Sequence, residues 1–315
     1  MPELPVDENN SAAVPVTGRY PRMQPLSFAV FALIGIFVLY QIIGGALTVV
    51  LFGSSVTQDN AAVMRWSTFA AQILFLLLPT WFLMRWQNGS IASVLGTRRP
   101  KMAEILLTIV GVFSLEQFVE GYWILQDKIP LPTSLQPIVD YVERVIEETF
   151  RLLVHANSTP ELLVVFLVVA LTPAVCEEIL FRGLIQKNLT LASTKTKGLV
   201  WTGIIFALYH LNPFLLVPLV ALGIYLGFLR SRSETIVIPM IAHFTNNFVS
   251  VIGEHVQANV ASSPELNFLL GSEDVGLSVV VTMMLGSALI FFLSLYVYLH
   301  VTSSLQPVED PEAIV

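Results

Sequence analysis

Glu177 and Glu178 stand side by side in the apolar segment AVCEEILFRGLIQ (174–186), and Arg182 follows four residues after the second glutamate. Residues four apart are neighbours on a helix, so Glu178 and Arg182 are expected to form a pair. Glu177 is rotated by about 100° from its neighbour, toward apolar residues. The spacing therefore predicts a glutamate without a local partner beside a structural ion pair.

Two further polar pairs occur later in the chain. The segment FALYH places Phe206 and His210 four residues apart, and HFTNN places His243 and Asn247 at the same spacing. Each pair is expected to share one face of a helix. Carboxyl and imidazole groups are the usual general acids and bases, and imidazole and carboxamide groups can donate hydrogen bonds to an oxyanion.

The composition places these residues in a membrane protein. Of the 315 residues, 55% are hydrophobic and 12% are charged, and the mean hydropathy is +0.73. Soluble domains carry about 25% charged residues, and a helix needs about 20 apolar residues to cross a bilayer. We expect an all-α polytopic membrane protein with about eight transmembrane helices, near residues 27–51, 67–84, 103–125, 161–187, 199–212, 214–229, 236–256 and 276–301.

The depth of the polar residues in these spans is similar. At a rise of about 1.5 Å per residue, Glu177 and His210 each lie roughly 15 Å from the inner ends of their spans. His243 and Asn247 lie roughly 12 and 18 Å from the start of theirs. Because ionisable residues at such depth are costly, about 2.5–3.5 kcal/mol on insertion scales, they usually face protein or water and mark function.

The three motifs together resemble those of the CAAX-processing and bacteriocin-processing intramembrane proteases, the Abi family. They are Glu177-Glu178-x-x-x-Arg182, Phe206-x-x-x-His210 and His243-x-x-x-Asn247, in this order. The resemblance covers about residues 160–256 and implies proteolysis in an intramembrane catalytic cavity, similar to that of type II CAAX prenyl endopeptidases.

The resemblance also implies roles for these residues. Glu177 and His210 would activate a water molecule, and His243 and Asn247 would stabilise the oxyanion. Glu178, Arg182 and Phe206 would support them. Glu177, His210 and His243 are the candidate ligands if a metal is used, since two His and one Glu with an open position is a known Zn²⁺ set. A metal-free glutamate mechanism uses the same residues, so both stay open.

The basic residues predict the orientation of the chain. With the N-terminus inside, eleven basic residues fall on the cytoplasmic side and four, Arg65, Lys128, Arg144 and Arg151, on the other. This excess follows the positive-inside rule and places both termini in the cytoplasm. Between the third and fourth spans, apolar residues at helical spacing around Val142 predict an amphipathic helix at the outer interface.

The chain divides into five predicted segments. They are a disordered tail (1–25), N-terminal transmembrane helices with the interfacial helix (26–159), the catalytic core (160–256), an outer loop with the last transmembrane helix (257–302), and an acidic tail (303–315). Cys176 is the only cysteine and is expected to be a packing residue, since a lone cysteine on an apolar helix usually is.

The expected partners are membrane lipids and a peptide or protein substrate, lipidated or not. No basic, aromatic-rich surface suggests nucleic acid. Two alternatives to a protease remain: a non-proteolytic scaffold or immunity-type member of the same family, and a transporter that relays protons through intramembrane carboxylates. No inverted repeat with broken helices supports the transporter.

Overall fold

The computed structural model describes residues 22–303 except 89, 97, 131 and 261–275. In this part of the chain all regular elements are helices. Residues 1–21 of the predicted tail (1–25) lie outside the described residues. The same is true of residues 261–275 of the predicted outer loop and of the acidic tail from residue 304. The all-α class of the prediction is confirmed.

The first two long rods form an N-terminal hairpin. Both change from α-helix to π-helix and back within an apolar run. The elements are α1 (Pro25–Phe37), η1 (Val38–Gly44) and α2 (Gly45–Phe52), then α3 (Ala61–Ala71), η2 (Gln72–Leu77) and α4 (Leu78–Asn88). Pro25 opens the first helix, at a position where its missing N–H has no intrahelical acceptor to lose.

The rest of the described chain contains seven long rods and one short connecting helix. The elements are α5 (Ala92–Leu95), α6 (Met102–Gln126), α7 (Gln136–Val154), a rod formed by α8 (Thr159–Val165), η3 (Phe166–Leu171), α9 (Thr172–Glu178), η4 (Ile179–Ile185) and α10 (Gln186–Ala192), then α11 (Lys195–Tyr209), α12 (Leu216–Ser233), α13 (Val237–Val260) and α15 (Leu277–Val301). The hydroxyls of Ser158 and Thr194 cap α8 and α11 by accepting the N–H groups of Glu161 and Lys197.

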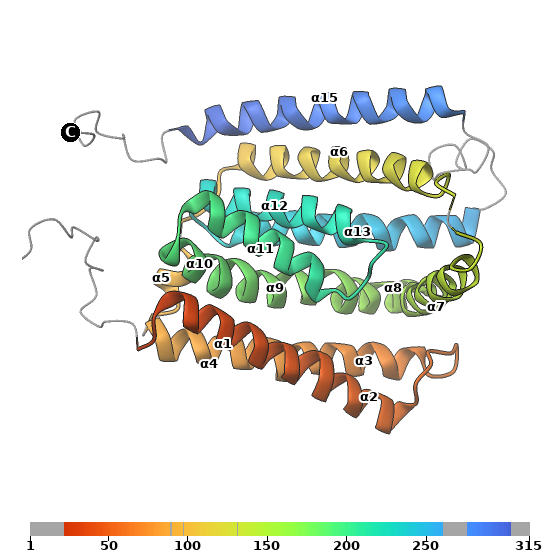
Figure 1. Cartoon of the computed structure of the whole chain (residues 1–315), viewed down its shortest axis with the longest axis horizontal. Helices are drawn as coiled ribbons and strands as arrows, with labels where there is room; N and C mark the ends of the chain where they lie inside the picture. Colours follow the sequence, from red (N-terminus) through yellow and green to blue (C-terminus); the bar gives the residue numbers. More distant parts are fainter. Residues whose placement is uncertain (1–21, 89, 97, 131, 261–275, 304–315) are drawn as a thin grey trace, which may run out of the picture.

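The long rods run side by side in one bundle (Figure 1). The hairpin of α1–α4 lies on one side, the rod of α8–α10 packs next to it, and α11, α12 and α13 follow. On the far side α6 contacts α13, and α15 packs on α6. The element that carries both glutamates is therefore an inner member of the bundle.

Within the described residues, six helices are long and apolar enough to cross a membrane: Pro25–Phe52, Ala61–Gln87, Met102–Gln126, Thr159–Ala192, Leu216–Ser233 and Leu277–Val301. These match six of the eight predicted spans. The other two predicted spans are also helices, α11 and α13, but α11 has only 15 residues and α13 carries several polar side chains. The predicted number of eight crossings therefore stays a prediction.

The helices α11 and α12 approach each other at glycines. A Cβ atom added to Gly203 would lie 2.8 Å from the Gly223 neighbour Ile224, and one added to Gly223 would lie 2.8 Å from the Cα of Gly203. Small residues allow such backbone contact between membrane helices. Gly223 belongs to the Gly223–Gly227 spacing, which predicts close helix packing.

We expect Gly203→Ala to lower the free energy of unfolding by about 1–3 kcal/mol, because the added methyl group has to separate α11 from α12. Gly35→Ala is the matched control, since Gly35 lies in α1 with no atom within 4 Å of its added Cβ. That variant should be neutral or more stable by up to about 1 kcal/mol. Chemical unfolding of both variants in mixed micelles measures the difference, and equal effects would contradict the packing argument.

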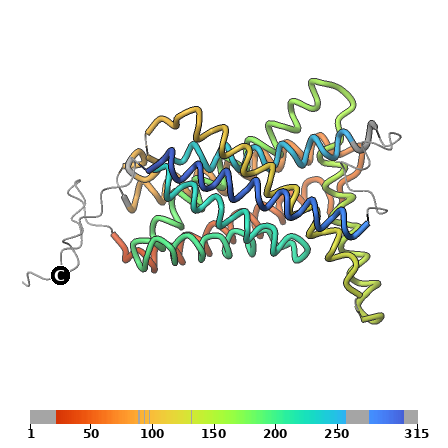
Figure 2. Tube along the Cα trace, turned by 90° about the horizontal axis from the view of Figure 1, so that it is seen from above, coloured from red at the N-terminus to blue at the C-terminus, as the bar shows by residue number. Residues whose placement is uncertain are grey.

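The predicted amphipathic helix forms α7, which projects from one end of the bundle (Figure 2). Half of its hydrophobic side chains are exposed, including Ile138 and Tyr141. The buried side chain of Arg65 on α3 anchors its C-terminus by donating to the backbone carbonyls of Leu152, Leu153 and His155. The same guanidinium binds Glu161 of α8 at 2.6 Å. The sequence places Arg65 among the four basic residues predicted on the outer side of the membrane, but it does not predict this anchoring role.

At the other end of the bundle, a loop before α6 is fixed to the turn between α12 and α13. The Arg98 guanidinium donates to both oxygens of Glu104, at 2.9 and 2.6 Å, and to the carbonyl of Ser233 at 2.7 Å. The hydrogen bonds to the Glu104 carboxylate raise the pKa of Arg98. Gly96 has φ +75°, and a Cβ there would lie 2.1 Å from the carbonyl oxygen of Glu234, so only glycine fits this contact.

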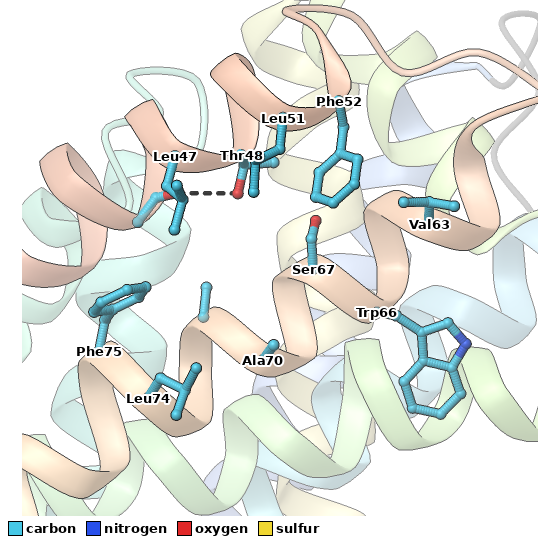
Figure 3. A pocket seen from close by; sticks show the side chains of 12 residues that line it. Leu47, Thr48, Leu51, Phe52, Val63, Trp66, Ser67, Ala70, Leu74 and Phe75 are labelled. Carbon is cyan, nitrogen blue, oxygen red and sulfur yellow. Dashed lines mark hydrogen bonds between the residues drawn. The ribbon is translucent and has the colours of Figure 1, made fainter.

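A hollow of about 370 Å³ lies between α2 and α3 (Figure 3). Apolar side chains such as Leu47, Leu74 and Phe75 form most of its lining. Its two hydroxyl groups donate within their own helices, Thr48 to the carbonyl of Gly44 and Ser67 to that of Met64. The hollow therefore suits an apolar occupant.

Candidate active site

Three segments bring the predicted site residues together. Glu177 and Glu178 end α9, where the helix changes to the π-helical η4. His210 is the residue that caps the C-terminus of α11, one position beyond the last helical residue. His243 lies in α13, two turns from its start. The span predicted at 199–212 thus ends earlier, at Tyr209, because Leu211 takes a left-handed backbone conformation with φ 53°.

Glu178 forms the predicted pair with Arg182, and the pair is fully buried. Arg182 Nη1 donates to Glu178 Oε1 at 2.7 Å, and Arg182 Nη2 donates to the carbonyl of Gly223 on α12 at 3.0 Å. The Arg182 guanidinium also lies 4.6 Å from the ring centre of Phe206 on α11, a cation–π distance. This network joins η4 to α11 and α12.

His243 extends the network toward Glu177. Its Nδ1 lies 2.9 Å from Glu178 Oε1, and its Nε2 lies 4.0 Å from Glu177 Oε2. An ionised carboxylate only accepts hydrogen bonds, so Nδ1 is the nitrogen that carries a proton here. Glu178 therefore fixes the orientation of the imidazole and leaves Nε2 directed at the first glutamate.

His210 is oriented by the backbone. Its Nδ1 donates to the carbonyl of Phe206 at 2.7 Å, and its Nε2 lies 3.7 Å from Glu177 Oε2. Because a carbonyl cannot donate, Nδ1 must carry the proton, and neutral Nε2 has a free lone pair. The Phe206 ring contacts both imidazoles, with centroid distances of 4.6 Å to His210 and 5.7 Å to His243. Its buried ring thus sets the separation of the two histidines.

Glu177 Oε2 lies between the two imidazoles without a direct hydrogen bond. Among the described residues this buried oxygen has no hydrogen-bond partner. The Glu177 side chain is 13% exposed and that of His210 30% exposed, whereas those of His243 and Glu178 are buried. Distances of 3.7 and 4.0 Å are too long for direct hydrogen bonds and are typical of groups that share a water molecule.

Asn247 lies one helical turn beyond His243 on α13 and is partly buried. Its carboxamide oxygen accepts a hydrogen bond from the Asn246 side chain at 3.3 Å. The NH₂ group of Asn247 is the part of the carboxamide that can donate to a substrate. Its role at an oxyanion stays a prediction. Cys176 is buried in the main apolar core, as expected of a packing residue.

The three candidate metal ligands have suitable orientations, but their atoms lie farther apart than the ligands of a zinc ion. His210 and His243 each have Nδ1 hydrogen-bonded and Nε2 directed inward, which is the usual pattern of ligating histidines. Ligand atoms around a tetrahedral Zn²⁺ lie about 3.4 Å apart, given bonds of about 2.0–2.1 Å. The distances to Glu177 are longer, and within the described residues no three His, Cys, Asp or Glu side chains form a metal-binding group. The arrangement as it stands does not fit a three-ligand site.

Sequence reasoning did not single out the polar residues that the N-terminal hairpin brings to the same region. Tyr40 of η1 and Gln72 of η2 interact with each other near Glu177, and Gln41 of η1 donates to the carbonyl of Tyr209, next to His210. Gln41 and Gln72 interrupt the apolar runs FVLYQIIGG and FAAQILFLLL. The rule that identified Glu177, a polar residue inside a membrane span, applies to them as well.

The fold and this site define the class: a multi-pass, all-α membrane protein with a glutamate–histidine cluster inside its helix bundle. Residues 159–249 match the family model described as Type II CAAX prenyl endopeptidase Rce1-like. Comparisons with curated proteins and with solved structures gave no match. The matched segment contains all three motifs, which supports the resemblance to the CAAX-processing and bacteriocin-processing membrane proteases.

Proposed function

We propose that the protein is an intramembrane endopeptidase that hydrolyses a peptide bond with a water molecule activated by Glu177 and His210. The observation that carries the proposal is the Glu177 Oε2 atom, buried, without a hydrogen-bond partner in the described residues, and 3.7 and 4.0 Å from two imidazole Nε2 atoms. A carboxylate left unpaired in an apolar region is costly unless a ligand completes its hydrogen bonds.

The attack uses the groups on the His210 side of the site. A water molecule between Glu177 Oε2 and His210 Nε2 gives a proton to one of these acceptors as its oxygen bonds to the carbonyl carbon. General bases contribute about 10²–10⁴-fold to such steps. When the tetrahedral intermediate collapses, the C–N bond breaks and the same proton passes to the leaving amine. The products are a new carboxylic acid and a new amine, which ionise in water to a carboxylate and an ammonium group.

The oxyanion is stabilised from the His243 side. With Nδ1 donating to Glu178, His243 donates from Nε2 as well when it is an imidazolium. The carboxylates of Glu177 and Glu178 flank the ring. The Asn247 NH₂ group is the second donor that we assign to the oxyanion. A single such donor is worth about 10²–10³-fold in kcat in other enzymes.

The proposed substrate is a peptide or protein segment with an apolar or lipidated part. The apolar hollow between α2 and α3 supports this choice. Two of its lining residues are Gly44, the last residue of η1, and Ala71, which directly precedes Gln72. We further propose that both termini are cytoplasmic and that the site opens to that side. The positive-inside distribution of basic residues supports this orientation.

The proposal is tested by offering the purified protein in lipid nanodiscs a peptide library with lipidated and unlipidated members, in water enriched in ¹⁸O. Hydrolysis is expected to yield two fragments per cleaved peptide, with one ¹⁸O in the new carboxylate as read by mass spectrometry. Binding of peptides without labelled fragments would contradict the proteolytic function and favour a scaffold.

Removal of metal ions is expected to leave kcat/KM within about twofold, because the donor atoms are not arranged as a three-ligand set. The measurement compares protein dialysed against a strong chelator with protein supplemented with Zn²⁺ afterwards. A loss of activity that only Zn²⁺ restores would contradict the metal-free mechanism and assign the ion to Glu177, His210 and His243.

A further inference from the structure

Polar side chains of the N-terminal hairpin lie in the part of the bundle near Glu177, outside the segment that matches the family. Tyr40 and Gln41 lie in η1, and Gln72 is the first residue of η2. All three stand in apolar runs. Burying such groups costs free energy unless they are hydrogen-bonded, so each needs a partner within the bundle.

One of these residues fixes the hairpin to the catalytic helices. Gln41 Nε2 donates to the carbonyl of Tyr209 at 2.9 Å, and Tyr209 directly precedes His210. The Tyr209 ring packs edge-on against Phe37 of α1 and Phe181 of η4, with centroid distances of 5.4 and 5.3 Å. Gln41 is therefore occupied by a structural contact, and its neighbour Tyr40 is held close to the site.

The other two residues interact with each other near the first glutamate. The Tyr40 hydroxyl is hydrogen-bonded to the side chain of Gln72 and lies close enough to the Glu177 carboxylate to interact with its charge. The Tyr209 hydroxyl is in range of both Glu177 and Tyr40. The segment η2 also packs directly on α9, the helix that ends at the two glutamates. Three elements thus place polar groups around one carboxylate.

Three atoms in this group lack a hydrogen-bond partner among the described residues: Glu177 Oε2, Gln72 Oε1 and the Tyr209 hydroxyl. The side chains of Gln72 and Tyr209 are only 5% and 6% exposed. Buried polar atoms in native proteins nearly always have a partner, and a water molecule or ligand is the usual one when the protein supplies none. The group is suited to bind water or a peptide group, which both donates and accepts.

The local backbone supports a functional interpretation. The segments η1 and η2 are π-helical, as is η4, which follows Glu178. They pack together, η2 against both η1 and η4. Single π-helical turns within α-helices occur frequently at functional sites, because the extra residue per turn redirects a side chain.

We propose that Tyr40 and Gln72 are positioning residues of the active site, which with Tyr209 hold the attacking water molecule and the scissile peptide group against Glu177. This inference rests on the proposed hydrolytic function. The Tyr40 hydroxyl donates toward the carboxylate side, and Gln72 Oε1 accepts from the water or the peptide N–H. The active site is then completed by the first two rods of the bundle, which lie outside residues 159–249.

The test compares kcat and KM of Tyr40→Phe and Gln72→Met with those of the wild type, using a peptide that the wild type cleaves. Both substitutions nearly keep side-chain volume and remove a polar group. Each is expected to lower kcat by about 10²-fold per folded protein, with KM within about threefold. The kcat of the double variant should be only slightly lower than that of the less active single variant, because the two residues act as one unit.

Tyr298→Phe is the matched control. Tyr298 on α15 is also a tyrosine with a buried hydroxyl, but that hydroxyl interacts with Ser233, and its ring neighbour is Phe228 of α12, so it does not belong to the group around Glu177. This variant should keep wild-type kcat. If Tyr40→Phe and Gln72→Met match Tyr298→Phe in kcat and differ only in unfolding temperature, they are packing residues and the inference is wrong.

The same experiment separates this inference from the proposed function. If the wild type cleaves the peptide and Tyr40→Phe and Gln72→Met cleave it equally well, only the positioning role of these two residues is contradicted. Cleavage that is equal in the wild type and in Glu177→Gln overturns the proposed function, and the positioning role with it. Loss of kcat in both hairpin variants, with Tyr298→Phe unchanged, supports the inference.

Discussion

Glu177→Gln is expected to lower kcat/KM by at least about 10³-fold and to leave the fold unchanged. Glutamine has nearly the same shape, but its carboxamide cannot accept a proton from water, and proton transfer to a positioned base contributes about 10²–10⁴-fold. The Oε2 atom makes no hydrogen bond within the described residues, and the two nearest groups, His210 and His243, are 3.7 and 4.0 Å away. The substitution therefore breaks no structural contact.

The measurement is the rate of peptide cleavage in nanodiscs, normalised to folded protein. Glu254→Gln is the matched control, because Glu254 forms an ion pair with the exposed Arg151 at 3.1 Å on another part of α13. That variant should keep wild-type kcat/KM. If Glu177→Gln retained activity within about threefold of the control, water activation by Glu177 would be ruled out.

The helical elements could be predicted from the sequence because they depend on local patterns. Apolar runs of about 20 residues specify membrane helices whatever their neighbours are. For this reason the predicted spans 27–51, 103–125 and 276–301 agree within two residues with Pro25–Phe52, Met102–Gln126 and Leu277–Val301. The pair of Glu178 and Arg182 was predictable for the same reason, since a spacing of four residues decides it.

The contacts between helices were beyond a local pattern. The hydrogen bond from His243 Nδ1 to Glu178 joins residues 65 positions apart, and only the packing of α13 against α9 brings them together. The depth of each residue in its span predicted a common layer for Glu177, His210 and His243 but not which side chains face one another. Gln72 was missed because a single amide in a membrane span is weaker evidence of a site than a carboxylate.

The second large effect is expected from Arg182→Met, which should lower the free energy of unfolding by about 3–5 kcal/mol. The substitution leaves Glu178 as a buried carboxylate without its cation, and breaking one side of a buried ion pair costs about this much. The side chains of both residues are fully buried, and Glu178 Oε2 already lacks a partner among the described residues. Chemical unfolding in mixed micelles measures the change.

Arg151→Met provides the control for loss of an arginine. Its partner is Glu254, and the Arg151 side chain is 60% exposed, so the change should be within about 1 kcal/mol. Equal stability of the two variants would contradict a structural role for the buried pair.

The double variant Arg182→Met/Glu178→Met separates stability from catalysis. Replacing both members of a buried pair by apolar residues is often neutral or stabilising, so unfolding should return toward the wild-type value. Peptide cleavage should stay low, because His243 Nδ1 has lost the carboxylate that orients it. Recovery of both properties would mean that Glu178 only compensates the charge of Arg182. Recovery of stability alone would assign the second glutamate to the catalytic histidine.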